Sequence, residues 1–242
     1  MKTNFKYLAW MVLALCSAIT AMAQQKQEKE CGLIAHRGLW KSGHPQNSIS
    51  GIQAALKSNY AGFECDIRQT KDGVLILNHD DDFHGVDIAD NNYESIRDGR
   101  QRPALLKDML DICGEYPGKT IFAEVKGGNT DDILAAFGAA AICEGVIFKS
   151  FNKDLCLDLI SKTDMPVWLL STNSLLDFDQ LKKEGFAGMS LMYEEGVTTP
   201  QLIDSLHSKG LLVAFWTVNN PEVAKQLAEW GADFVITDLP NL

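Results

Sequence analysis

Two histidines of this sequence each follow a short apolar segment and precede a charged residue. His36 comes after "IA" and before Arg37, and His79 comes after "VLILN" and before Asp80. A lone histidine of this kind is usually a structural residue, but two imidazoles can act as general base and general acid near neutral pH. The guanidinium of Arg37 adds a planar set of donors that matches phosphate oxygens. These segments therefore predict proton transfer at a phosphate group.

Three acidic side chains occur at spacings that would bring them to the interior face of a sheet. Glu64 and Asp66 are separated by one residue, as are Glu124 and Lys126. Alternate residues of a strand point to the same side, so each pair would share a face. Carboxylates that lose water repel one another, and a hard cation relieves both effects. We therefore predict that Glu64, Asp66 and Glu124 hold one divalent cation, and that Lys126 is free to pair with an anionic substrate.

Each pair also has a simpler explanation. Glu64 and Asp66 could be solvated acids on an exposed edge strand, and Glu124 with Lys126 could form an internal salt bridge. Carboxylates without clustered cysteine or histidine suit Ca²⁺ or Mg²⁺ better than Zn²⁺. We retain a single Ca²⁺ or Mg²⁺ ion as the predicted cofactor.

The elements that must position these residues alternate along the chain. Eight segments are predicted as strands: Gly32–Ala35, Gly62–Ile67, Thr120–Val125, Gly145–Lys149, Pro166–Leu170, Gly188–Met192, Leu211–Trp216 and Asp233–Thr237. The amphipathic segments between them are predicted as helices: Ser48–Asn59, Leu105–Glu115, Asp131–Ala141, Lys153–Ser161, Phe178–Glu184, Pro200–Lys209 and Glu222–Trp230. This alternation predicts an α/β fold, a TIM-type (β/α)8 barrel. An open doubly wound sheet is the alternative, but no Gly-rich phosphate loop supports it.

One further strand-like segment, Val74–Asn78, follows the turn sequence "TKDG". It predicts a β-hairpin extension after the second strand. A pivot between Asp72 and Gly73 would pair Asp66 with His79. The acidic, irregular residues 80–103 that come next predict a short loop or lid above the active-site face of the barrel.

The N-terminal 23 residues have the pattern of a secretory signal peptide. A basic start precedes the apolar run Tyr7–Ala21, and "AMA" provides a cleavage site after Ala23. A membrane anchor is the alternative, although the run is short for a span of about 20 residues. Lipoprotein anchoring at Cys16 is less favoured, because Leu15 is large for a lipoprotein box. We predict an exported protein, periplasmic or secreted, with one catalytic domain over residues 31–242 and no membrane span in the mature chain.

Charge and cysteine content narrow the possible partners. Without residues 1–23 the chain keeps 20 basic and 32 acidic residues, a net charge of −12. This argues against nucleic acid or an anionic membrane as a partner. Five cysteines follow residue 23 with no paired spacing, and those at 65, 113, 143 and 156 are predicted to be buried thiols. The sequence leaves the oligomeric state open.

The motifs in their order along the chain are similar to those of a known family. "HRG", "PQNS", "ECDIRQTKDGVLILNHD", "AEVK", "AFWTVN" and "VITDLP" extend from residue 34 to residue 240. In this combination the chain resembles the glycerophosphodiester phosphodiesterases, which have a TIM barrel of the PI-phosphodiesterase-like superfamily. The resemblance implies a divalent cation and hydrolysis of a glycerophosphodiester to glycerol phosphate and an alcohol.

The resemblance also implies roles for individual residues. His36 and His79 match the acid/base pair of the family, and Glu64, Asp66 and Glu124 match its metal ligands. The positions that match substrate-binding groups are Arg37, Lys126, Asn47 and Trp216. For Trp216 plain core packing is an equal alternative. The family usually has glutamate where this chain has Gln46, which lowers the local negative charge by one unit and could weaken or alter metal binding.

Two other functions remain as hypotheses. A barrel of this type could cleave lipid substrates, as lysophospholipase D or sphingomyelinase D enzymes do, and a wide apolar groove above the barrel would favour that. Residues 80–103 are acidic with few large apolar side chains, so soluble diesters are favoured. Gln46 is the one feature that suggests an inactive, secreted binding protein.

Overall fold

The structure, a computed structural model, describes residues 30–242. The predicted signal peptide, residues 1–23, lies outside the described residues. Residues Cys31–Leu242 form one compact unit. Within the described part of the chain, no helix has both the length and the apolar character needed to cross a membrane.

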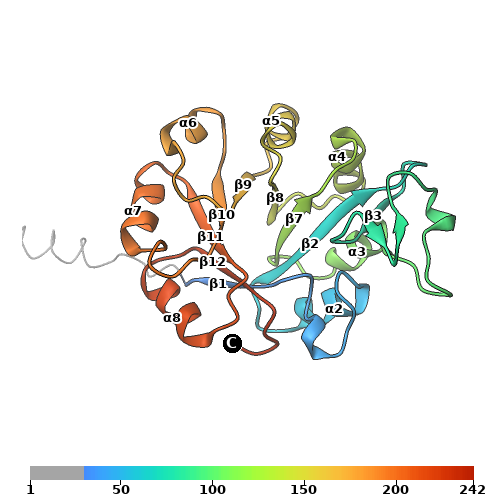
Figure 1. Cartoon of the computed structure of the whole chain (residues 1–242), viewed down its shortest axis with the longest axis horizontal. Coiled ribbons are helices and arrows are strands. Elements are labelled where there is room, and N and C mark those ends of the chain that lie inside the picture. Colours follow the sequence, from blue (N-terminus) through green and yellow to red (C-terminus); the bar gives the residue numbers. More distant parts are fainter. Residues whose placement is uncertain (1–29) are drawn as a thin grey trace, which may run out of the picture. The chain divides into compact units, whose positions relative to one another are not determined.

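Eight parallel strands close into a barrel inside a ring of helices (Figure 1). The barrel strands are β1 (Gly32–Ala35), β2 (Gly62–Gln69), β7 (Thr120–Val125), β8 (Val146–Ser150), β9 (Val167–Ser171), β10 (Gly188–Met192), β11 (Leu212–Trp216) and β12 (Phe234–Thr237). The first strand pairs with both the second and the last, which closes the barrel. The predicted TIM-type barrel is confirmed, and each strand begins within one residue of its predicted start.

Helices connect the strands on the outside of the barrel. They are α2 (Ile49–Lys57), α3 (Leu106–Cys113), α4 (Thr130–Ala139), α5 (Lys153–Lys162), α6 (Phe178–Lys183), α7 (Pro200–Ser208) and α8 (Pro221–Glu229). All but α3 begin with a side-chain cap. For α8, Asn220 accepts from the amide of Glu222 and Pro221 occupies the first turn, so the chain enters the helix directly after the strand-end loop.

Alternation along each strand divides the apolar residues between two cores. Residues that point outward form a large core under the helices, including Cys65, Ala123 and Phe148. Residues that point inward fill the barrel, where Phe122 packs edge-to-face on Trp168 at a centroid distance of 5.3 Å. Because Phe122 and Glu124 share the inward face of β7, the apolar filling of the barrel leads directly to the polar residues at the carboxyl ends of the strands.

The hairpin after β2 is present, but its predicted register is wrong by one residue. Strand β3 (Leu75–Leu77) runs antiparallel to β2 and pairs Ile67 with Leu77. The amide of Asn78 donates to the carbonyl of Asp66 at 3.0 Å, so Asn78 and not His79 lies opposite Asp66. His79 is the first residue beyond this pair.

The turn explains the difference in register. Gly73 has φ +83° and its amide donates to the carbonyl of Thr70, while Thr70 pairs with Val74. Three residues therefore connect the strands, with glycine in the left-handed conformation that ends a three-residue turn. A pivot between two residues, as predicted, would require an even number of loop residues.

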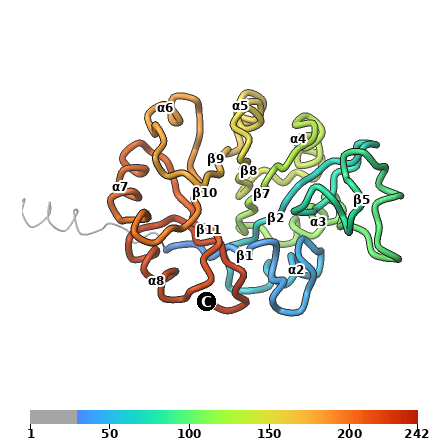
Figure 2. The backbone as a smooth tube through the Cα atoms, viewed as in Figure 1, coloured from blue at the N-terminus to red at the C-terminus, as the bar shows by residue number. Residues whose placement is uncertain are grey.

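Residues 80–103 form a small substructure at the outer edge of the ring, beside α3 (Figure 2). They contain the short hairpin of β4 (Asp82–Phe83) and β5 (Val86–Asp87) and a 3-10 turn, η2 (Tyr93–Ser95), and lead to β6 (Ala104–Leu105), which pairs with β3. The apolar side chains Ile88 and Ile96 are buried against Ile76 of β3. This excursion is thus anchored to the barrel by its own small core.

The prediction of buried thiols is correct for three of the four cysteines. Cys65, Cys113 and Cys156 are buried, and Cys143 is exposed. Cys143 lies in the loop between α4 and β8, where Ala140 and Ile142 pack on the core. The apolar sequence around Cys143 is therefore explained by the packing of Ile142, and the Cys143 thiol itself is exposed.

Phe122→Ala tests the interior packing of the barrel. We expect the free energy of unfolding to fall by about 3–5 kcal/mol, because the ring is fully buried and contacts both Trp168 and Phe234. Urea unfolding followed by circular dichroism measures the change. Leu175→Ala, at a side chain that is 87% exposed, is the control and should shift it by less than about 0.5 kcal/mol. A loss as small as in the control would contradict this account of the barrel core.

Candidate active site

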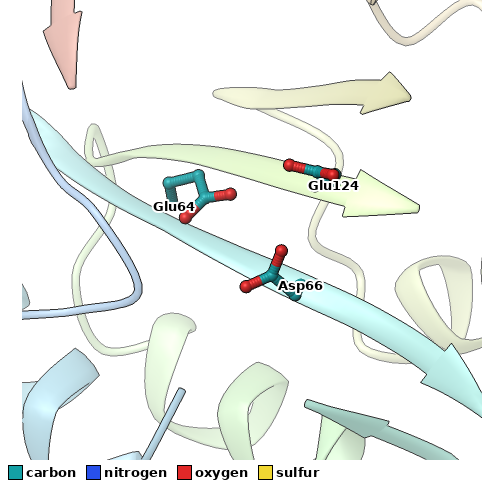
Figure 3. A group of neighbouring side chains, drawn as sticks. All are labelled: Glu64, Asp66 and Glu124. Atoms are coloured by element: carbon teal, nitrogen blue, oxygen red, sulfur yellow. The ribbon is translucent and has the colours of Figure 1, made fainter. Parts of the chain in front are cut away.

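Three buried carboxylates lie together inside the barrel. Glu64 and Asp66 are side by side on β2, and Glu124 lies on the adjacent strand β7 (Figure 3). The strand register places Glu124 directly beside Asp66. One oxygen from each of the three residues lies within 4.8 Å of the others. The three carboxylates could therefore hold one metal ion.

Cations from neighbouring elements offset the charge of Asp66 and Glu124. The ammonium of Lys126 lies 2.5 Å from Glu124 Oε1 and 3.2 Å from Asp66 Oδ1. The Nε atom of Arg37 lies 3.5 Å from Asp66 Oδ2. Lys126 thus forms the internal salt bridge that the sequence left open, and it does so within the same cluster.

A third cation, Lys149, was not predicted to have a role. It is the inward-facing residue beside Glu124 on the next strand, β8, and is 2% exposed. Its ammonium lies 3.2 Å from Glu64 Oε1 and 3.5 Å from Glu124 Oε2. Burial lowers the pKa of Lys149, but the two glutamates outweigh burial and raise the pKa above its ordinary value. The signal for this residue was its position, two residues after the inward-facing Ile147.

The loop after β1 wraps around Asp66. Asn47 donates from Nδ2 to Asp66 Oδ2 at 2.8 Å, and its Oδ1 accepts from the amide of Asp66 at 3.0 Å. The backbone of Arg37 (φ +55°) turns sharply to make this loop, and its amide donates to Glu64 Oε2 at 3.0 Å. Gly38 lies so close to the backbone of Gly51 that a Cβ atom would be 2.8 Å from its carbonyl carbon. A side chain at residue 38 would therefore displace the loop that carries Arg37.

Electrostatics keep Asp66 ionised in this setting. Burial raises its pKa, and the charges of Lys126 and Arg37 together with the hydrogen bond from Asn47 lower it more. The net result is a pKa below the ordinary value of an aspartate. Gln46 stands at the edge of this network, where its Oε1 accepts from Arg37 at 2.7 Å. The amide thus contacts the guanidinium and does not belong to the carboxylate cluster.

His36 lies directly after β1 and is held by an aspartate from the far end of the chain. Its Nδ1 is 2.7 Å from Asp238 Oδ1, and its Nε2 is 3.9 Å from Glu64 Oε2. Asp238 also accepts from the indole of Trp40 at 3.0 Å and from Asn219 Nδ2 at 2.7 Å. Partial burial opposes ionisation of Asp238, but these donors outweigh it and lower its pKa. The "VITDLP" motif contained Asp238, although no role was predicted for it.

His79 has a similar but more local partner. Its Nδ1 lies 2.8 Å from Asp80 Oδ1, and its side chain is 39% exposed. The guanidinium of Arg68 on β2 donates to the carbonyl of His79 at 2.9 Å and so fixes the backbone here. In both histidines Nδ1 faces an aspartate; Nε2 of His36 faces Glu64, and Nε2 of His79 has no hydrogen-bond partner among the described residues.

A small cavity of about 80 Å³ brings these groups together. Its lining residues are His36, Arg37, His79, Glu124, Lys126, Lys149, Phe151, Leu170, Trp216 and Thr217. Trp216 both lines this cavity and packs on the interior core, so the two alternatives considered for it coexist. Its ring meets Phe151 edge-to-face at 5.7 Å. The lining of the cavity thus combines charged side chains with an aromatic pair.

The sequence from the first of these histidines to the end of the chain matches a known family model. Residues 36–242 match the Glycerophosphoryl diester phosphodiesterase family. The chain belongs to this family. The match begins at His36 and includes every residue placed above at the carboxylate cluster and the cavity. The family and the enzyme class predicted from the motifs are therefore confirmed.

The chain is similar over most of its length to individual members of the family and to solved structures. A glycerophosphodiester phosphodiesterase of Bacillus altitudinis is 23% identical over 234 residues, 86% of this chain and 95% of that protein. The crystal structure of a glycerophosphodiester phosphodiesterase from Parabacteroides distasonis has a TM-score of 0.80 and 27% identity, covering 88% of this chain and 94% of that one. A phosphodiesterase of Oleispira antarctica, solved with the product sn-glycerol-3-phosphate, has a similar fold with a TM-score of 0.75 and 18% identity, covering 87% of this chain and 94% of that one.

Asp238→Asn tests whether the ionised aspartate stabilises this end of the barrel. We expect the free energy of unfolding near pH 7 to fall by about 1–2 kcal/mol, because a charged acceptor for three side chains is lost. Since the native pKa of Asp238 is lowered, its stabilisation is complete above the unfolded pKa of about 4 and disappears as the pH falls through the native pKa. Urea unfolding of both proteins at neutral and acidic pH measures this. A difference between them that does not change with pH would contradict the assignment.

Proposed function

We propose that this protein hydrolyses glycerophosphodiesters to glycerol phosphate and an alcohol, using one divalent cation, Ca²⁺ or Mg²⁺, and two histidines. One observation carries the proposal: His36, His79 and Glu124 line a single cavity, and Glu124 belongs to a cluster of three buried carboxylates. Membership of the phosphodiesterase family supports the choice of reaction.

The donor set at the cluster suits a hard cation. Glu64, Asp66 and Glu124 offer only carboxylate oxygens, and Glu64 Oε1 and Asp66 Oδ1 are buried without a hydrogen bond. Each of these two oxygens instead lies 3.2 Å from a lysine ammonium, that of Lys149 for Glu64 and that of Lys126 for Asp66. Oxygen ligands of this kind favour Ca²⁺ or Mg²⁺. When bound, such an ion supplies a Lewis acid for a phosphate oxygen and a template for the substrate.

In the proposed reaction the two histidines move protons at opposite ends of the reacting phosphate. Each has its Nδ1 beside an aspartate, which orients the ring. One Nε2 takes the proton from the attacking oxygen, and the other gives a proton to the leaving alcohol as its bond to phosphorus breaks. If water attacks, glycerol phosphate forms directly; if the glycerol 2-hydroxyl attacks, a cyclic phosphate forms first and water then opens it to glycerol phosphate. Arg37 and Lys126 attract the anionic diester into the cavity, and Asn47 holds Asp66 in place.

One observation favours lipid substrates as a second candidate. Phe151, Leu175 and Met192 are exposed apolar side chains on the segments that end or follow β8, β9 and β10. Phe151 also lines the cavity, so an acyl chain could lie on this side of its mouth. None of the exposed large hydrophobic residues in the described part of the chain lies in the acidic excursion, residues 80–103.

Substitution of either histidine tests the proton transfer. We expect His36→Ala and His79→Ala each to lower kcat by about 100-fold or more, because each removes a general acid or base. Release of alcohol from a glycerophosphodiester gives the rate. His44→Ala, at a histidine that does not line the cavity, is the control. A wild-type rate in either variant would remove that histidine from the mechanism.

A substrate panel separates the candidate functions. We expect turnover of glycerophosphodiesters with choline, ethanolamine, inositol or glycerol head groups in Ca²⁺ or Mg²⁺, and none in chelator, because the carboxylates need the ion to engage the phosphate. Lysophosphatidylcholine is the lipid arm, with Phe151→Ala as its variant. Preferential cleavage of the lysolipid that is lost in this variant would favour the lipid function. Full activity in chelator would contradict the metal, and tight binding without turnover would indicate a binding protein.

A further inference from the structure

Lys149 is the one cation of the site that lies wholly within the barrel. The register of β2, β7 and β8 puts Asp66, Glu124 and Lys149 in one row across three neighbouring strands. All three side chains face inward, and Lys149 is 2% exposed. An ammonium in this position is not solvated by bulk water, so it is stabilised by the carboxylates around it.

The ammonium lies between two of the three carboxylates proposed as metal ligands. It contacts Glu64 Oε1 at 3.2 Å and Glu124 Oε2 at 3.5 Å. The other two cations contact the remaining oxygens of the cluster. Lys126 pairs with Asp66 and with Glu124 Oε1, and Arg37 pairs with Asp66. Three carboxylates therefore face three cations, and the cluster is neutral before any ion binds.

We infer that Lys149 is a built-in counter-ion that competes with the divalent cation for Glu64 and Glu124. The inference rests on the metal site of the proposed function. An ion bound by these glutamates has to displace the Lys149 ammonium and then remain close to a like charge. Lys149 consequently holds the carboxylates together before an ion binds and sets the affinity for metal lower than three carboxylates alone would give.

Two other roles for Lys149 make different predictions. If it only completed a structural ion pair, its removal would weaken the fold and would not tighten metal binding. If it only bound the phosphate of the substrate, its removal would leave metal affinity unchanged when no substrate is present. Metal binding without substrate is therefore the measurement that isolates the proposed role.

The experiment titrates Ca²⁺ into chelator-stripped full-length protein by calorimetry, with thermal unfolding in chelator and in Ca²⁺ as a second readout. We expect Lys149→Gln to tighten Ca²⁺ binding by about tenfold or more, because one repelling charge is removed from a buried site. The same variant should have a lower Tm than wild type in chelator and a larger gain in Tm on adding Ca²⁺.

Two controls match this variant. Lys149→Arg keeps the charge and should keep the weak affinity of the wild type. Lys153→Gln removes a lysine from α5 whose ammonium pairs with Glu184 at 2.7 Å, away from the cavity lining, and should leave Ca²⁺ binding unchanged. Tighter binding in Lys149→Gln alone supports the inference.

Three results would overturn it. Equal or weaker Ca²⁺ binding in Lys149→Gln, with binding by the wild type intact, rejects the role of Lys149 and leaves the proposed function standing. Failure of both proteins to bind Ca²⁺ or Mg²⁺ rejects the metal site itself. A Lys149→Gln protein that stays unfolded in saturating Ca²⁺ shows that the ion does not replace the ammonium, which also contradicts the inference.

Discussion

The burial of three carboxylates inside one barrel is the constraint on which the rest of the site depends. Transfer of a single ionised carboxylate out of water costs several kcal/mol unless it is paired and hydrogen-bonded. Here the compensation comes from Arg37 in the loop after β1, Lys126 after β7 and Lys149 in β8, together with the amide of Asn47. These groups are far apart in the sequence. The barrel brings them close enough to offset the free-energy cost of burying the three carboxylates.

The fold could be predicted closely because its determinants are local. Strand periods of two separate the inward Phe122 and Glu124 from the outward Ala123, and this pattern is visible in six consecutive residues. Helix starts are marked as plainly, as at Asn220 and Pro221. Because consecutive strand and helix units lie side by side around the barrel, the fold could be predicted without knowledge of long-range contacts. The inward direction of the carboxylates was predicted from the same local alternation.

The parts that were missed depend on contacts that local patterns do not contain. Asp238 and His36 are 202 residues apart, and no spacing rule relates them. Lys149 acquires its surroundings only when β8 is placed beside β7, whose inward residue at that level is Glu124. The hairpin register depended on whether one glycine belonged to the turn, a difference of a single residue. In each case the residue type was visible in the sequence, but its partner was not.

The two histidines are consequently held in different ways. His36 depends on closure of the barrel, because Asp238 follows β12 and the pairing of β1 with β12 brings the two residues together. His79 depends on its neighbour Asp80 and on Arg68, which binds its backbone from β2, and it remains partly exposed. A change in barrel packing would therefore disturb His36 first, whereas a movement of the excursion would disturb His79. The position of His36 thus depends on closure of the barrel, and that of His79 on the hairpin and its neighbouring residues.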